Sequence, residues 1–135
     1  MSTQTPNAPT RLYKKSDLTF NPYGSEPGKA SLARIIGPET SQTIGAGIAT
    51  FDDTSVEWTV LYDEIIICLS GVFHLTVDGE TFEAHPGDVL WVPEYTPVVY
   101  SGQKAEVFYT LYPVNWTETR YQAESFNRNM TGENL

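Results

Sequence analysis

The chain has 135 residues, and its 17 acidic and 8 basic side chains give a formal net charge of −9. That length suits one domain, and the acidic balance excludes a nucleic-acid binder or a protein that docks on anionic lipid, since both need a basic surface. The single cysteine, Cys68, excludes an internal disulfide and a cysteine-cluster metal site.

Residues 1–10 are polar and contain proline, so we expect a flexible tail and no secretory signal. The longest strongly apolar run, Ile65 to Leu69, is too short to span a bilayer. We therefore expect a cytoplasmic protein with no membrane partner. Residues 11–116 are expected to form the folded domain. Residues 117–135 are expected to form a polar tail, in which Glu118 to Phe126 is a candidate short helix.

The sequence of the first half of the domain predicts strands separated by turns. Alternating or β-branched runs predict strands at Ser31 to Ile36, Ile44 to Phe51, Val56 to Val60 and Ile65 to Leu69. The last of these is short and continuously apolar, which is typical of a strand buried on both faces. Ser70-Gly71 is expected to break it.

The strongest local signal is a hairpin. Two alternating runs flank Asp78-Gly79, and a two-residue type I′ turn favours this pair because it needs two positive φ angles. His85-Pro86-Gly87-Asp88 fits a type II turn. Further strands are expected at Val89 to Val92, Val98 to Tyr100 and Glu106 to Tyr112. Short strands with frequent turns predict an all-β sandwich or barrel.

The spacing from Glu64 to Pro97 resembles that of the cupins, which are small jelly-roll β-barrels. Glu64 and Gly71 match the first cupin motif, and Gly79, Pro86-Gly87-Asp88, Pro93 and Thr96-Pro97 match the second. Within that family, the segments WTVLYDEI (residues 58–65) and YPVNW (residues 112–116) are similar to those of the ethanolamine-utilization EutQ subfamily. The resemblance implies an all-β fold, a single RmlC-like cupin barrel.

The resemblance also implies a metal site, which this chain does not keep. Typical cupins bind iron, manganese, nickel or zinc through three histidines and the glutamate. The histidine positions fall on Trp58, Val60 and Val98, or on Glu57 and Thr59 at the alternative spacing of the first two. One carboxylate is a poor ligand set for such metals. We therefore expect no metal and no cofactor.

Glu64 is the leading candidate for a catalytic residue. The cupin resemblance places it inward, and Tyr62 shares its parity unless the strand bends. A carboxylate inside an apolar barrel is costly unless it is hydrogen-bonded or protonated, and burial raises its pKa toward the range useful for acid–base catalysis. The alternative is that Glu64 only bonds tyrosine hydroxyls and backbone amides. The neighbouring Asp63 has the opposite parity and is expected to be a turn residue that caps local amides.

An unusual number of aromatic residues accompanies Glu64. Together they suggest a pocket for a small polar or cationic organic molecule, although core packing is the alternative for each one. The expected partners of Glu64 in catalysis are Tyr62 and Tyr109, and the latter matches a tyrosine of the EutQ subfamily. The expected ligand contacts are Trp58, Tyr100 and Trp91, and Tyr95 belongs to the same group.

Three classes of function remain open. The first is a metal-independent isomerase or lyase with Glu64 as acid or base. The second is a non-catalytic metabolite-binding module, and the third is an assembly protein such as a bacterial microcompartment would use. The resemblance also implies acetate kinase activity, but the sequence has no phosphate-binding glycine loop, and Lys104 is the only Lys or Arg between residues 35 and 119.

The expected partners are a small-molecule ligand and a second copy of the chain. A small barrel of this type has edge strands that must be covered. Ser31 to Ile36 is the candidate strand for pairing in a homodimer.

Overall fold

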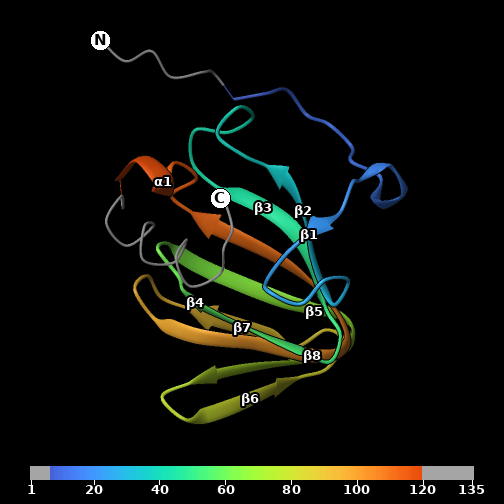
Figure 1. Cartoon of the computed structure of the whole chain (residues 1–135). Coiled ribbons are helices and arrows are strands. Elements are labelled where there is room, and N and C mark those ends of the chain that lie inside the picture. The colour runs from blue at the N-terminus through green and yellow to red at the C-terminus, as the bar shows by residue number, and fades with distance from the viewer. Residues whose placement is uncertain (1–6, 120–135) are drawn as a thin grey trace.

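The structure is a computed structural model and describes residues 7–119 (Figure 1). The eight strands are β1 (Asn21–Pro22), β2 (Ala30–Ile36), β3 (Gly45–Phe51), β4 (Thr54–Thr59), β5 (Asp63–Val77), β6 (Glu80–Ala84), β7 (Val89–Val92) and β8 (Pro97–Tyr112). A 3₁₀ turn, η1 (Lys15–Asp17), precedes them, and a one-turn helix, α1 (Trp116–Thr119), follows. The expectation of an all-β fold is confirmed.

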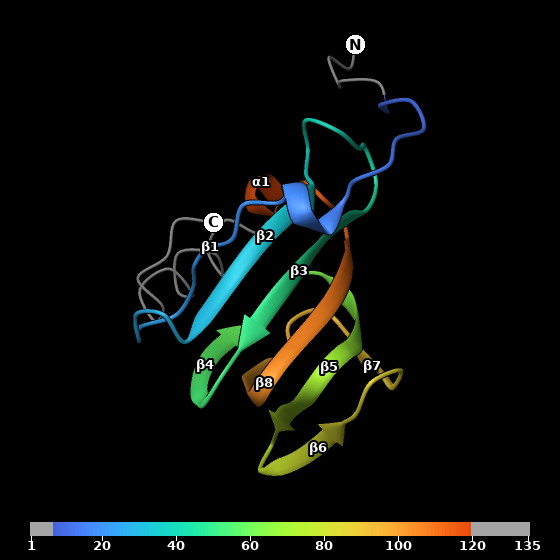
Figure 2. The same cartoon turned by 90° about the vertical axis from the view of Figure 1, so that its right-hand side faces the viewer.

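The strands form an antiparallel sheet that folds over into two layers, and β5 and β8 pass through both (Figures 1 and 2). In one layer, β3 pairs with the second half of β8, and β7 pairs with the first half of β5. In the other layer, β4 pairs with the first half of β8, and β6 pairs with the second half of β5. This arrangement encloses a core between the layers, as a jelly roll does.

In both long strands, the inward-facing positions switch between even and odd residue numbers, and the two switches lie at the same bend. On β5 the buried positions are even up to Cys68 and odd from Phe73, and on β8 they are even up to Gly102 and odd from Ala105. The pairing register also shifts between Cys68 and Val72. Because each strand gains an extra residue at the bend, its inward face continues from one layer into the other.

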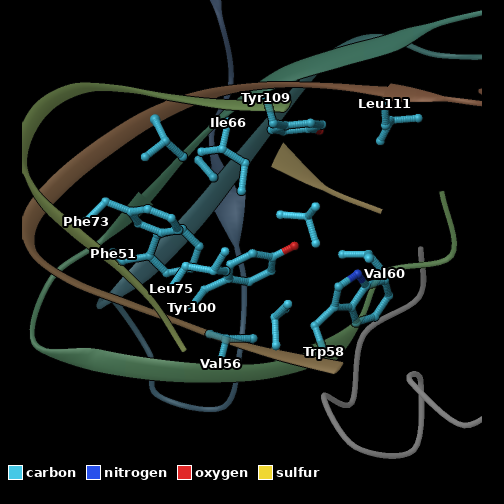
Figure 3. Close-up of a cluster of buried hydrophobic side chains, with 14 of the residues drawn as sticks. Phe51, Val56, Trp58, Val60, Ile66, Phe73, Leu75, Tyr100, Tyr109 and Leu111 are labelled. Atoms are coloured by element: carbon cyan, nitrogen blue, oxygen red, sulfur yellow. The ribbon is translucent and has the colours of Figure 1, made fainter. Parts of the chain in front are cut away.

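Aromatic rings fill the middle of the core. Phe51, Phe73 and Tyr100 pack against one another with ring centroids 5.5 to 6.0 Å apart (Figure 3). Trp58 and Tyr62 contact Trp116 of α1 with centroids 6.1 and 5.2 Å from it. Such offset or edge-on contacts add to the stabilisation from burial alone.

Both turns predicted from the sequence are present. Asp78 and Gly79 have φ angles of 51° and 80°, as a type I′ turn needs. Gly87 has a φ of 95°, and the Asp88 amide donates to the His85 carbonyl at 2.8 Å, as in a type II turn. The turn at 52–55 is shorter than expected, since β4 already begins at Thr54.

Three expectations about the strands were wrong. Ser70-Gly71 does not end a strand, because β5 continues through it with a bulge. The segments 98–100 and 106–112 are parts of one strand, β8. Ile65 to Leu69 is buried on one face only: Ile65 and Leu69 are 40% and 44% exposed. A continuous apolar run does not reveal by itself whether a second layer covers its outer face.

The segment before β1 is attached to the barrel from its first described residues. The amide of Ala8 donates to the Thr40 carbonyl at 2.9 Å, and Asn7 Oδ1 accepts from the Gln42 amide at 2.8 Å. The described part of the expected flexible tail, residues 7–10, is thus hydrogen-bonded to residues 40–42. Most of the candidate helix at Glu118 to Phe126 lies outside the described residues. Within residues 7–119, no helix is long and apolar enough to cross a bilayer.

Gly71 should be one of the least replaceable residues of the fold. It has a φ of 70°, and a Cβ here would overlap the backbone carbonyl of Lys104. We predict that Gly71→Ala lowers the free energy of unfolding by about 3 kcal/mol or more, measured by urea denaturation. Gly79→Ala is the matched control: φ is 80° but no atom lies within 4 Å of its Cβ, so the loss should be only about 1–2 kcal/mol. Equal losses at the two positions would contradict the proposed steric constraint.

Candidate functional site

A cavity of about 60 Å³ lies between the two layers. Strands β2, β3, β4, β5 and β8 contribute to its walls, and α1 borders one side. Its lining is mainly aromatic and aliphatic, with polar groups from Tyr23, Arg34, Trp58, Tyr62, Glu64, Tyr100, Tyr109 and Trp116. Mostly apolar walls with a few converging polar groups are typical of small-molecule sites, although such sites usually have a volume of several hundred Å³.

Glu64 is the buried carboxyl group of this cavity. It pairs with Val92 of β7 and Leu111 of β8, which fixes its side chain on the inner face, where it is only 4% exposed. The hydroxyl of Tyr100 donates to Glu64 Oε1 at 2.8 Å. Burial raises the pKa of Glu64 to about 7, although the hydrogen bond from Tyr100 lowers it. At neutral pH this group therefore exchanges readily between its acid and base forms.

The indole and phenol groups beside Glu64 hold one another in place. Trp58 Nε1 donates to the Tyr62 hydroxyl oxygen at 3.0 Å, and both rings contact Trp116. The bond leaves the proton of the Tyr62 hydroxyl available to another acceptor. The direction of Tyr62, which the sequence left open, is inward.

The phenol of Tyr109 lies against β3 at a glycine, which has no side chain to block it. Tyr109 pairs with Gly47 of β3, and a Cβ on Gly47 would overlap the Tyr109 hydroxyl and lie 2.6 Å from the Ala33 carbonyl oxygen. The absence of a side chain at residue 47 lets the phenol cross β3 toward β2. Arg34 of β2 pairs with Gly47 from the other side, and its charge acts on the phenol.

The three tyrosines near Glu64 remain protonated at neutral pH. Burial and the nearby carboxyl group raise the pKa of Tyr62 and of Tyr100 well above 10. Burial raises the pKa of Tyr109 to about 12, and Arg34 opposes this shift. The tyrosines can therefore donate hydrogen bonds, whereas Glu64 is the carboxyl or phenol group of the cavity that titrates near pH 7.

The structure brings together five of the six predicted site residues and excludes one. Glu64, Tyr62, Tyr109, Trp58 and Tyr100 all line the cavity. Trp91 does not: it pairs with Ile65 and lies on the outer face, 60% exposed. Its neighbour Val92 takes the inward place.

Two further expectations concerned single residues. Tyr95, expected among the pocket aromatics, is 53% exposed in a turn where its φ is 69°. Asp63 caps a backbone amide, but not a local one as expected: its Oδ1 accepts from Glu94 N–H, 31 residues along the chain, at 3.0 Å.

Arg34 was not predicted from the sequence, and Trp116 entered only as part of a motif. Arg34 continues an alternation on β2 in which Ala30 is buried in the core and Leu32 lines the cavity. That alternation was the signal, but an exposed basic residue at a strand end usually marks a solvent face. Trp116 reaches the cavity from α1, which no strand pattern could indicate.

The residues at the cupin metal positions do not fit a metal. Trp58, Val60 and Val98 are all buried among core side chains. Of these three positions and Glu64, only Glu64 has a side chain that can bind a metal. His74 and His85 lie outside the cavity, where their Nε2 atoms bond the two oxygens of Glu83 at 3.3 and 2.7 Å. Within residues 7–119, no three histidine, cysteine or acidic side chains gather in a way that could hold an ion.

Comparison with known proteins gives consistent matches. Residues 14–118 match the model of the family "Ethanolamine utilisation protein EutQ". The acetate kinase EutQ of Salmonella typhimurium LT2 is 31% identical over 103 residues, which make up 75% of this chain but 45% of that protein. The chain thus spans about half the length of the curated relatives it matches.

Solved structures agree with this assignment. An ethanolamine utilization protein Q from Salmonella typhimurium LT2 superimposes with a TM-score of 0.71 at 27% identity, covering 77% of this chain and 86% of that one. An RmlC-like cupin from Shewanella frigidimarina has a TM-score of 0.62 at 14% identity, over 80% of this chain and 95% of that one, and shows the shared fold alone.

Glu64→Gln should change how stability depends on pH. The unfolded carboxyl group ionises around its ordinary pKa of 4.5, whereas the folded one ionises near 7. The contribution of Glu64 to the free energy of unfolding is therefore fully present below pH 4.5, and about 3 kcal/mol of it is lost as the pH rises to 7. Glu64→Gln keeps an oxygen for Tyr100 and cannot ionise, so it should lack this loss.

Urea unfolding between pH 4 and pH 8 measures the difference. Glu57→Gln, on the exposed face of β4, is the control and should follow the wild-type profile. If Glu64→Gln also follows that profile, then the burial of Glu64 does not control its ionisation.

Proposed function

The chain belongs to the EutQ family of ethanolamine utilisation proteins and has the cupin fold, and from this premise we propose that its barrel binds a small polar organic molecule on which Glu64 acts as an acid or base. The single observation that carries the proposal is the position of Glu64. It is a buried carboxyl group that lines a cavity, and Tyr100 is its one side-chain hydrogen-bond partner among the described residues.

The chemistry proposed is proton transfer without a metal. A group with a pKa near the working pH is the most effective general acid or base. Glu64 would remove or add a proton at the ligand, while Tyr62 and Tyr109, protonated at neutral pH, would donate hydrogen bonds to a developing oxyanion. Isomerases and lyases are the reaction classes that need such groups and nothing else.

A non-catalytic binding module would use the same cavity. The two proposals differ in what Glu64 does, because a receptor needs it to be positioned and an enzyme needs it to exchange a proton. An assembly role would not require the cavity at all. Experiments that follow proton exchange at the ligand therefore separate the three classes.

We predict that the protein exchanges carbon-bound hydrogen of its ligand with solvent. A library of small metabolites, ethanolamine and acetate included, is first screened by the indole N–H signals in NMR spectra. Binding in the barrel should shift the signals of Trp58 and Trp116, while Trp91 on the outer face is an internal control. Bound compounds are then incubated with protein in D₂O, and deuterium incorporation is measured.

The variant Glu64→Gln should reduce the exchange rate by about 10²-fold or more while leaving the affinity within a few-fold. Glu57→Gln should leave both unchanged. If a ligand binds but undergoes no exchange, the binding-module alternative is favoured. If no compound in the library shifts either cavity tryptophan, the proposal of a barrel ligand is wrong.

Acetate kinase activity is a second candidate, favoured by the name of the relatives and by the guanidinium of Arg34 at the cavity. It would transfer the γ-phosphoryl group of ATP to acetate, giving ADP and acetyl phosphate. Acetate-dependent release of ADP by this chain would establish it. Against it, phosphoryl transfer needs several cationic groups or metal ions around the phosphates, and Arg34 is the only Lys or Arg among the described residues that line the cavity.

We also propose that the partner of this chain is a second copy of itself, bound through the outer face of β5, β7 and β8. Strand register brings together on this face Ile65, Ile67, Val89, Trp91, Phe108, Thr110 and Tyr112, and Leu69 continues the alternation of Ile65 and Ile67 on β5. Five of these are 40% to 61% exposed. The sequence suggested β2 as the pairing strand, but β1 already covers part of its edge.

The charge of the chain favours a second copy on this face. Two acidic groups on the same strands as the apolar patch already have partners: Asp63 accepts from an amide, and Glu106 pairs with Lys15 at 2.6 Å. Two copies of a chain with a net charge of −9 repel each other where acidic surfaces meet. An uncharged face avoids this repulsion and can therefore pair with the same face of a second copy. Exposed apolar patches of this kind usually mark interfaces.

Trp91→Glu should convert a dimer into a monomer, as measured by light scattering at micromolar concentrations. It places a charge opposite an apolar patch without touching the core. Leu12→Glu is the control, because Leu12 is 78% exposed on the segment before β1 and should leave the dimer intact. A monomeric wild-type protein, or a Trp91→Glu dimer, would refute the assignment of this face.

A further inference from the structure

A second cavity, of about 210 Å³, adjoins the cavity of the barrel. Arg34, Tyr109, Leu111 and Trp116 line both, so they form a neck between the two spaces. The second space, which we call the vestibule, lies among the end of β2, residues 37–39, the start of β3 and α1. A ligand can therefore extend from Glu64 in the barrel past the neck into the vestibule.

Arg34 is the one Lys or Arg in the described lining of either space. Within residues 7–119, no carboxylate lies at ion-pair distance from it. The vestibule does contain Glu39, but this side chain turns toward Gly37, where a Cβ on the glycine would lie 2.9 Å from both carboxylate oxygens. The guanidinium at the neck is thus free to bind an anion.

The two ends of the combined space have opposite chemical character. Near Arg34, a planar guanidinium and the protonated hydroxyl of Tyr109 are both donors, which suits a carboxylate or phosphate. At Glu64, a carboxyl group that is partly ionised at neutral pH would repel an anion and accept a hydrogen bond from a hydroxyl or amine. An anionic ligand can therefore bind in one orientation only.

The size of the barrel cavity limits the group that enters it. Its volume of about 60 Å³ is well below the ~150 Å³ of a cavity that admits benzene. Only a short head group of a few non-hydrogen atoms fits beside Glu64. The remainder of a larger ligand has to lie in the vestibule.

We propose that the ligand is a small organic anion that presents a hydroxyl or amine to Glu64 and binds its carboxylate or phosphate at the neck through Arg34 and Tyr109. This inference rests on the proposed function, since it names the class of molecule that the barrel takes. It makes Arg34 the residue that selects anions over neutral analogues.

The test compares matched probes by NMR titration, followed through the indole signals of Trp58 and Trp116. Glycolate carries a hydroxyl and a carboxylate, glycolamide has a neutral amide in place of the carboxylate, and acetate lacks the hydroxyl. Inorganic phosphate and 2-hydroxyethyl phosphate, which keeps a free hydroxyl, test phosphate as the anion. Glycolate or 2-hydroxyethyl phosphate should bind at least about tenfold more tightly than glycolamide. Acetate should bind more weakly than glycolate, because it has no donor for Glu64.

Variants of Arg34 separate its charge from its shape. Arg34→Gln should weaken binding of the anions by about tenfold or more and leave glycolamide within about twofold. Arg34→Lys should give an intermediate loss, because it keeps the charge without the planar pair of donors. Arg11→Gln is the control, since Arg11 packs over Tyr13 and lines neither space.

The outcomes distinguish this inference from the function on which it rests. If glycolamide binds as well as glycolate, or Arg34→Gln leaves anion affinity unchanged, the ligand is not selected as an anion, while a barrel ligand still stands. If no anion shifts the cavity tryptophans although the metabolite screen finds a neutral or cationic ligand, the inference is wrong and the proposed function holds. If neither experiment finds a ligand, both are wrong.

Discussion

The antiparallel pairing of β5 with β8 is the interaction on which the rest of this structure depends. Of the strands within residues 7–119, these two alone run through both layers, and each gains one residue at the shared bend. The coincident shifts keep a single inward face along each strand. One strand therefore supplies Glu64 and the other supplies both Tyr100 and Tyr109 to the same interior. A slip of one residue in either strand would turn that strand's inward side chains outward and so separate Glu64 from the tyrosines.

The site and the hydrophobic core are the same region of the molecule. Tyr100 packs on Phe51 and Phe73 through its ring and bonds Glu64 through its hydroxyl, so one side chain serves both. A buried carboxyl group lowers stability at neutral pH, and the aromatic packing around it offsets that cost. Such a cost is typical of a group kept for chemistry or recognition, which is the role proposed for Glu64.

Much of the fold was predictable from local patterns, because turns and alternation are local properties. The Asp78-Gly79 hairpin and the turn at Gly87 follow from residue type and spacing, whereas the inward direction of Glu64 was implied by the cupin resemblance. The outward direction of Trp91 did not, because it depends on the register of a four-residue strand. Arg34 was missed since its role comes from the strand beside it, where a glycine lets Tyr109 approach. Register and neighbouring strands are tertiary properties, and a single sequence encodes them only weakly.

Gly47 has a consequence for how relatives of this protein can diverge. The space that a side chain at residue 47 would fill is occupied by the Tyr109 phenol, although Gly47 itself lines neither cavity. A methyl group there would force the phenol into another rotamer and so reshape the neck. Ligand preference can therefore change within this barrel while every residue that touches the ligand keeps its identity. Two family members with identical linings need not share a substrate.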